Sequence, residues 1–205
     1  MKLTDILYEI GDASAKAFRW TTKGSVDMKL KQFAVGIGNQ KSYMNWLGPF
    51  KIGYEAVSDN QTEYQIGMEL MGRKRMSLML PGVEKPKNDK SPKYELEVWL
   101  SFTVGDSDED TNLNEQYRVM ATVIECVEDF IKKASKIYLI KSINILPKSD
   151  TGSDPSFDSR RGRLYLAYVK RNISKLPGKW TAYADSEGIS IKNGDWSGGD
   201  VVAKS

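Results

Sequence analysis

The stretch "YELEVWLSFTV" at residues 94–104 decides the fold class, because its side chains alternate between apolar and polar. Its alternate apolar positions are Leu96, Val98, Leu100 and Phe102. The positions between them include Glu95, Glu97 and Ser101. A period of two places the apolar side chains on one face of a β-strand and the polar side chains on the other. The stretch therefore predicts a strand of an antiparallel sheet, with one face turned towards a core.

Short segments rich in aromatic and β-branched residues precede this strand, from about residue 18 onward, and are separated by Gly, Pro, Asn and Asp. The candidate strands among them are "MKLKQFAVGI" (28–37), "FKIGYEAV" (50–57), "TEYQIGMEL" (62–70) and "KRMSLML" (74–80). Residues 81–93 carry three prolines and four lysines and predict an exposed connection. Before all of these, Leu3, Ile6, Leu7 and Ile10 have helical spacing and Gly11 follows, which predicts a short amphipathic helix.

Helical periodicity returns after the acidic stretch at residues 105–114. Residues 114–134 predict a helix whose apolar positions are Val119, Val123, Val127, Phe130, Ile131 and Ala134. The segment "KIYLIKSINILP" (136–147) predicts a strand that stops at its proline, and 160–176 predict a second long helix capped by Asp158 or Ser159. The apolar positions of that helix are Leu164, Tyr165, Tyr168, Val169, Ile173 and Leu176. A hairpin around residues 185–188 is expected after it.

This order of elements predicts an α+β protein. We expect a largely antiparallel β-sheet, with the helices at 114–134 and 160–176 packed on one face and the short amino-terminal helix nearby. A chain of 205 residues, 40% of them hydrophobic, has enough apolar side chains for the core of one domain. The predicted domain is residues 1–205, with a β-rich part at 1–104 and a helix–strand–helix–hairpin part at 105–205.

The number of cysteines and the hydropathy of the sequence indicate the cellular compartment in which the protein is expected. Cys126 is the only cysteine, so no disulfide can form within the chain, and a reducing cytoplasm is expected. Acidic residues at positions 5, 9 and 12 interrupt any apolar region at the amino end, which argues against a signal peptide. The longest strongly apolar stretch, residues 119–127, is too short to span a bilayer.

The absence of histidine from the sequence removes the commonest general base, the usual Ser/His and Cys/His pairs, and His-ligated metal sites. Residues 35–42, "VGIGNQKS", lack two glycines of a phosphate-binding loop and favour a glycine-punctuated strand end or turn. The acidic stretch at 105–114 has Thr111 and Tyr117 where a calcium loop needs Gly and Glu. We therefore predict no catalytic residues, no metal site and no cofactor.

The remaining reactive side chains of the helix at 114–134 have simpler interpretations. Cys126 falls on or beside the apolar face, which predicts a buried thiol. Helical spacing turns Glu125, Glu128 and Asp129 towards the polar face, where they are expected to be solvated charges.

The stretch "SRRGRLYLAYVKRNISKL" (159–176) is the most distinctive in the chain. Its apolar positions predict a core-facing stripe, and a candidate interaction face consists of its bases Arg160, Arg161, Arg163, Lys170 and Arg171. Residues 158–179 hold seven basic residues and one acidic residue, whereas residues 105–131 hold eight acidic residues and one basic residue. Two alternatives follow: either the acidic segment neutralises the basic face, or a partner such as nucleic acid does.

Four segments together resemble a group of bacteriophage proteins: "EIGDASAKAFRW" (9–20), "NEQYRVMATVIECVEDFIKK" (114–133), "KSINILPK" (141–148) and "RGRLYLAYVKR" (161–171). The residues that carry this resemblance are Gly11, Asp12, Arg118, Thr122, Arg161, Leu164 and Tyr165. It covers about half of the chain and implies a phage origin without implying any catalytic residue.

We expect a non-enzymatic phage protein that acts through protein–protein contacts as a structural or assembly component of the virion. Its expected location is the host cytoplasm or the virion, and its expected partners are phage or host proteins, including further copies of itself, and no membrane. The alternatives are an inhibitor of a host or anti-phage defence protein, and a basic accessory protein that binds nucleic acid.

Overall fold

The computed structural model describes residues 15–42, 44–75, 92–104, 115–145, 160–185 and 188–194. Of residues 116, 160–164 and 185 it describes the backbone alone. The predicted amino-terminal helix therefore lies outside the described residues. So do residues 76–80 of the fourth candidate strand and most of the connection predicted at 81–93.

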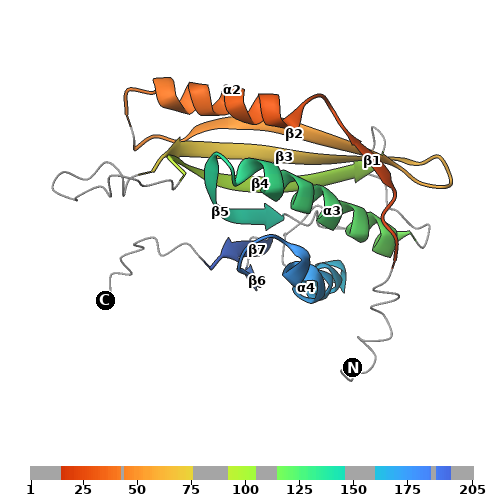
Figure 1. Ribbon diagram of the computed structural model, residues 1–205. Coiled ribbons are helices and arrows are strands. Elements are labelled where there is room, and N and C mark those ends of the chain that lie inside the picture. Colours follow the sequence, from red (N-terminus) through yellow and green to blue (C-terminus); the bar gives the residue numbers. More distant parts are fainter. Residues whose placement is uncertain are drawn as a thin grey trace, which may run out of the picture.

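A single mixed sheet of seven strands organises the described residues, in the order β1-β2-β3-β4-β5-β7-β6 (Figure 1). Its strands are β1 (Arg19–Thr22), β2 (Leu47–Val57), β3 (Glu63–Lys74), β4 (Tyr94–Val104), β5 (Tyr138–Ile145), β6 (Trp180–Asp185) and β7 (Gly188–Asn193). Every neighbouring pair is antiparallel except β4 and β5. The predicted α+β class with a largely antiparallel sheet is confirmed, as is the hairpin that β6 and β7 form around residues 185–188.

Strand β4 has the bounds that its alternating sequence predicts and lies at the centre of the sheet. It pairs with β3 along its whole length, from Tyr94 opposite Lys74 to Val104 opposite Tyr64. Its other neighbour, β5, is parallel, because helix α3 (Gln116–Ala134) carries the chain back along the sheet between the two strands. Helix α3 confirms the helix predicted at 114–134.

Helix α2 (Val26–Asn39) corrects the strand predicted at 28–37, and with it the strand end or turn predicted at 35–42. Its buried side chains recur at helical spacing: Val26, Leu30, Phe33, Ala34 and Ile37. Ser25 caps the helix by accepting a hydrogen bond from the Met28 backbone N–H. The alternation of Met28 and Leu30 with lysines imitates a strand over four residues only, whereas the helical pattern continues for three turns.

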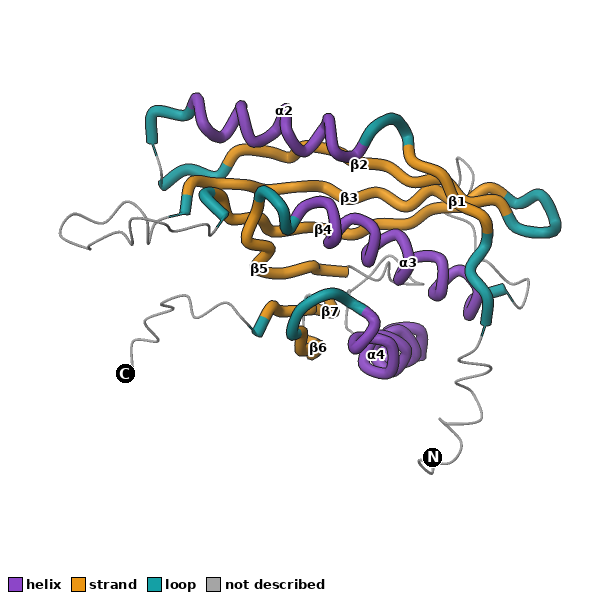
Figure 2. The backbone as a smooth tube through the Cα atoms, viewed as in Figure 1, coloured by secondary structure: helices purple, strands orange, loops and turns teal. Residues whose placement is uncertain are grey.

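A glycine in β3 lets α2 lie close to the sheet. A Cβ atom at Gly72 would come within 2.5 Å of Ile37 Cδ1 and 2.9 Å of Phe33 Cε1. The side chains of α2 therefore occupy the space that a side chain at position 72 would need. Helix α2 contacts β2, β3 and α3 (Figure 2).

Helix α4 (Arg160–Asn172) begins where the sequence predicts, and a short 3-10 helix, η2 (Ile173–Lys175), follows it. The predicted helix at 160–176 therefore changes to a tighter turn in its last residues, as helix ends often do. Helix α4 contacts β6 and β7 and also α3, so α3 lies between α2 and α4 (Figures 1 and 2).

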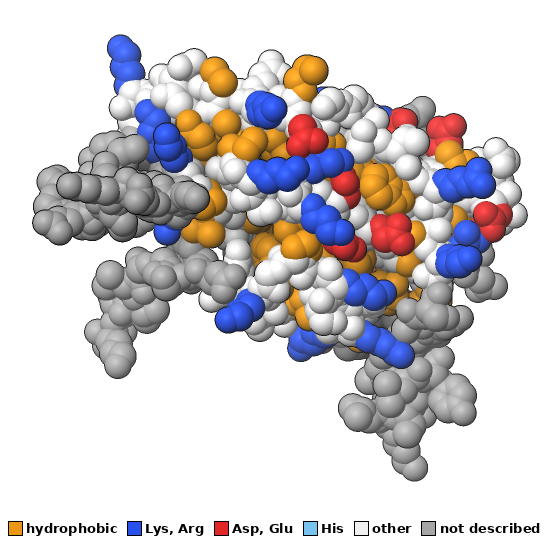
Figure 3. Space-filling view, in the orientation of Figure 1, with side chains coloured by type: hydrophobic (Ala, Val, Ile, Leu, Met, Phe, Trp, Pro, Cys, Tyr) orange, Lys and Arg blue, Asp and Glu red, His pale blue; other side chains and the backbone are white. Residues whose placement is uncertain are grey.

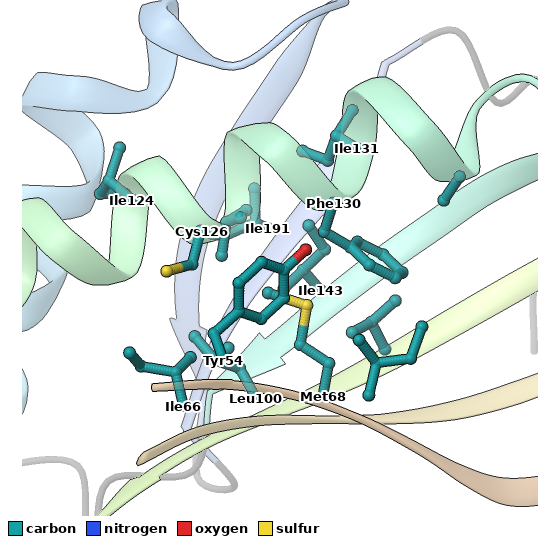
Figure 4. Close-up of a cluster of buried hydrophobic side chains, with 14 of the residues drawn as sticks. Tyr54, Ile66, Met68, Leu100, Ile124, Cys126, Phe130, Ile131, Ile143 and Ile191 are labelled. Atoms are coloured by element: carbon teal, nitrogen blue, oxygen red, sulfur yellow. The ribbon is translucent and has the colours of Figure 1, made fainter. Parts of the chain in front are cut away.

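The core lies between α3 and the strands (Figure 4). From α3 it receives Phe130 and Ile131, and Met68, Leu100, Ile143 and Ile191 enter from four strands. Of the apolar positions predicted for α3 only Val123 is half-buried, and the others are buried. Cys126 is buried as predicted, and its burial raises the pKa of the thiol far above its usual range.

Candidate functional site

Two members of the predicted basic face have described side chains, and both lie at the end of α4. Lys170 and Arg171 are exposed there, whereas the preceding Tyr168 and Val169 are buried. Tyr165 is half-buried and packs edge-to-face on Phe102, with ring centroids 6.1 Å apart. The core-facing stripe predicted for this helix is thus confirmed for its described side chains. The backbone of Arg160, Arg161, Arg163 and Leu164 forms the first turns of α4, and their side chains lie outside the described part.

Two further exposed bases lie where the chain leaves α4. Lys175 ends η2, and Lys179 immediately precedes β6. The elements η2, α4 and β6 contact one another, so these bases lie on or next to neighbouring elements. We call Lys170, Arg171, Lys175 and Lys179 the α4 basic surface. Figure 3 shows Lys and Arg side chains over this end of the molecule.

The acidic residues of the neighbouring α3 have other partners. Glu125 accepts a hydrogen bond from Trp20 Nε1 at 3.1 Å, and Glu128 pairs with Lys132 one turn along the same helix at 2.5 Å. Asp129 pairs with Lys133 at 2.7 Å and also accepts the Tyr54 hydroxyl at 3.0 Å. Burial and this carboxylate together raise the pKa of Tyr54 far above its usual range. The prediction that Asp129 is a merely solvated charge is wrong, because it is half-buried and tied to the core.

Glu115, just before α3, is buried and accepts hydrogen bonds from the Tyr64 hydroxyl at 2.9 Å and from Asn60 Nδ2 at 3.2 Å. Burial and this contact raise the pKa of Tyr64 to about 12. Among the described residues, no ion pair joins α3 to α4. The charge pattern leaves two alternatives open for the basic face. In the described structure the acids of α3 do not neutralise Lys170 and Arg171.

Two of the residues that carry the phage resemblance attach the start of the described chain to α3. Thr122 Oγ1 accepts the Phe18 backbone N–H at 2.9 Å and donates to the Arg118 carbonyl at 2.7 Å. Arg118 Nε donates to the Lys16 carbonyl at 3.1 Å, and its guanidinium lies 4.3 Å from the centre of the Phe18 ring. One turn of α3 thus holds residues 16–18 immediately before β1.

Aromatic stacking extends this attachment into the sheet. The Phe18 ring stacks on Tyr64 with centroids 5.5 Å apart and planes 8° from parallel. On its outer side Arg118 also forms an ion pair with Asp59, and this contact holds the pKa of the Asp59 carboxyl below its usual range. Arg118 and Thr122 therefore have a structural role. Gly11 and Asp12, which share the same resemblance, lie outside the described residues.

We expect Thr122→Val to lower the free energy of unfolding by about 1–2 kcal/mol, because the buried Phe18 N–H then lacks its acceptor. Thr122→Ser keeps the hydroxyl and is expected to lose less than half as much. Urea unfolding measures the loss, and amide exchange of Phe18 should accelerate in the valine variant alone. Equal effects of the two variants would show that the methyl group, not the hydrogen bond, holds this segment.

A polar cluster that the sequence pattern did not predict lies beside β3, β4 and β5. Arg73 pairs with the buried Glu95 directly opposite it, at 2.9 Å, and its guanidinium lies 4.6 Å from the centre of the Trp46 ring. Lys141, at an irregularity in the β4–β5 pairing, reaches Glu97 at 3.4 Å. Glu95 is on the polar side of β4 as predicted, yet Arg73 and its surroundings bury it. Strand register alone brings these residues together, which is why no local motif reveals them.

The described residues contain no group of three or more Cys, Asp or Glu side chains that could hold a metal ion. None of the described helices is both long and apolar enough to cross a membrane. Comparison of the chain with protein-family models, with curated proteins and with solved structures finds no match.

Proposed function

We propose that this protein acts through protein–protein contacts and is a structural or assembly component of a phage particle. The observation that supports contact with a protein is the outer side of α2. Met28 and Val35 are 69% and 62% exposed there, and Met44, shortly after the helix, is 58% exposed. We call these three residues the α2 apolar surface. Figure 3 shows hydrophobic side chains at the surface over α2.

The spacing of these residues explains how one helix is apolar on two sides. Met28 and Val35 are seven positions apart, which is two helical turns, so both lie on the same side. The opposite side already buries Leu30, Phe33 and Ile37 against the sheet. Large apolar side chains that face water cost free energy, and gathered on one element they indicate a surface that a partner covers.

The assignment to a phage particle rests on the resemblance of the four sequence segments to phage proteins. A particle component needs contact surfaces rather than an active site, and it is synthesised in the host cytoplasm before it is assembled. A phage inhibitor of a host or defence protein would use such a surface as well, but it would be absent from finished particles.

We expect the protein to be found by mass spectrometry in purified phage particles and the double variant Met28→Glu/Val35→Glu to be excluded from them. Two buried carboxylates without partners would cost several kcal/mol in an apolar contact. The matched control is Lys31→Gln/Gln32→Glu, which changes the net charge of the exposed side of α2 by the same amount.

Circular dichroism should show that both double variants are folded. Absence of the unchanged protein from particles would overturn the virion assignment and favour the inhibitor. Incorporation of Met28→Glu/Val35→Glu at the level of the control would overturn the role of the α2 apolar surface.

A further inference from the structure

We propose that the α4 basic surface binds the phosphate backbone of double-stranded nucleic acid. This activity goes beyond the protein contacts proposed for α2, since it uses another surface and another kind of partner. It rests on three properties of Lys170, Arg171, Lys175 and Lys179: the lack of acidic residues between positions 165 and 184, their polar surroundings and the inward position of nearby aromatic rings.

The positive charge of this surface has no acidic residue within its own span of the chain. Residues 165–184 contain no Asp or Glu, and the next acidic residues along the chain are Asp185, Glu187 and Asp195. The acidic side chains of α3 could have neutralised this positive charge, but they contact Trp20, Tyr54 and the lysines of α3 itself. The whole chain has a formal charge of only +3, so the attraction for an anion is a local property of this end of the molecule.

The surroundings of these bases are polar, which favours phosphate over a protein partner. The exposed neighbours are Ser174, Gly178 and Thr181, whereas Leu176 is buried. The large hydrophobic side chains that are strongly exposed in the described residues, such as Met28 and Val35, belong to other elements. A protein interface needs an apolar centre, whereas phosphate oxygens need bases, hydroxyls, amides and backbone N–H groups.

The aromatic rings near this surface are unavailable for stacking on bases, which favours a duplex over a single strand. Tyr168 is buried, and Tyr165 packs on Phe102. Trp180 is half-buried against the core and donates from Nε1 to the Pro177 carbonyl at 2.7 Å. Proteins that hold single strands present such rings to the nucleobases. Contacts limited to phosphates predict binding that is independent of sequence and sensitive to salt.

The test is a fluorescence-anisotropy titration of the full chain with a labelled duplex DNA of mixed sequence. Four phosphate contacts predict that affinity falls on the order of 100-fold between 50 and 200 mM salt. The variant Lys170→Gln/Arg171→Gln/Lys175→Gln/Lys179→Gln should bind at least about 100-fold more weakly at 50 mM salt. The single variants Lys170→Gln and Lys175→Gln should each reduce the slope of log affinity against log salt by about 1.

The matched control removes four exposed lysines elsewhere: Lys31, Lys41, Lys93 and Lys136, each changed to glutamine. It has the same net charge as the α4 variant and should bind DNA nearly as well as the unchanged protein. Absence of binding at 50 mM salt would overturn the proposal, and so would an equal loss in the control. Polyglutamate that competes as well as duplex DNA, at equal charge, would also overturn it in favour of an acidic protein partner, and single-stranded DNA that competes better would overturn the preference for a duplex.

This test is independent of the one for α2. We expect Met28→Glu/Val35→Glu to bind DNA like the unchanged protein, because α2 and the α4 basic surface lie on opposite sides of α3. Failure of DNA binding would leave the protein contact through α2 standing, and exclusion from particles is measured without reference to DNA.

Discussion

Replacing Phe130 with alanine is expected to lower the free energy of unfolding by about 3–5 kcal/mol. Phe130 is completely buried in the cluster of Figure 4, where α3 packs on the strands. The substitution removes the apolar area of the ring from the core and leaves a cavity between α3 and the sheet. Neighbours such as Met68 and Ile143 come from different strands, and their backbones cannot close the cavity without breaking strand pairing.

Urea unfolding followed by circular dichroism measures this loss. Val123→Ala is the control on the same helix, because Val123 is half-buried and its truncation should cost less than about 1.5 kcal/mol. A loss of under about 1 kcal/mol for Phe130→Ala would mean that α3 is not packed on the sheet as described.

Replacing Arg73 with leucine is expected to lower the free energy of unfolding by about 3–5 kcal/mol, for an electrostatic reason. The side chains of Arg73 and Glu95 are 20% and 8% exposed, so most of the hydration that Glu95 would have in water is absent. Leucine at position 73 leaves this carboxylate buried without its ion-pair partner. Removing one member of a buried pair is costly even where the intact pair adds little to stability.

A double-mutant cycle separates the cost of the unpaired Glu95 carboxylate from the contribution of the intact ion pair. Arg73→Leu/Glu95→Leu should lose less stability than Arg73→Leu alone, because the buried charge is gone in the double variant. The exposed pair Lys51–Glu69 supplies the comparison, and Lys51→Leu should change stability by about 0–1 kcal/mol. If Arg73→Leu changed stability as little as Lys51→Leu, the Glu95 carboxylate would have to be solvated.

Elements defined by local periodicity could be predicted from the sequence. Strand β4 has its predicted bounds, α3 matches its predicted apolar face closely, and Cys126 is buried as expected. Helix α2 was mistaken for a strand because Met28 and Leu30 alternate with lysines at its start. Its true pattern becomes visible only when Phe33 and Ile37 are included. The α2 apolar surface was missed for the same reason, since Met28 and Val35 share a side only in a helix.

Contacts between residues far apart in the sequence could not be predicted in this way. The amide of Phe18 meets Thr122 across 104 positions, and Arg73 meets Glu95 because the β3–β4 register places them opposite each other. The acids of α3 and the bases of α4 are complementary in sequence, yet in the described residues the acids of α3 contact Trp20, Tyr54 and the lysines of α3 itself.

The sequence by itself determined the α+β class, the strand at 94–104, the helix at 114–134 and the carboxyl-terminal hairpin. Each of these depends on periodicity or turn residues within about twenty positions, which act before distant segments meet. Only the tertiary structure decided that β5 lies parallel to β4 and which partners the acids of α3 have. The physical reason is that a buried face and an ion pair are completed by whichever side chains the packing brings within reach, however far away they lie in the chain.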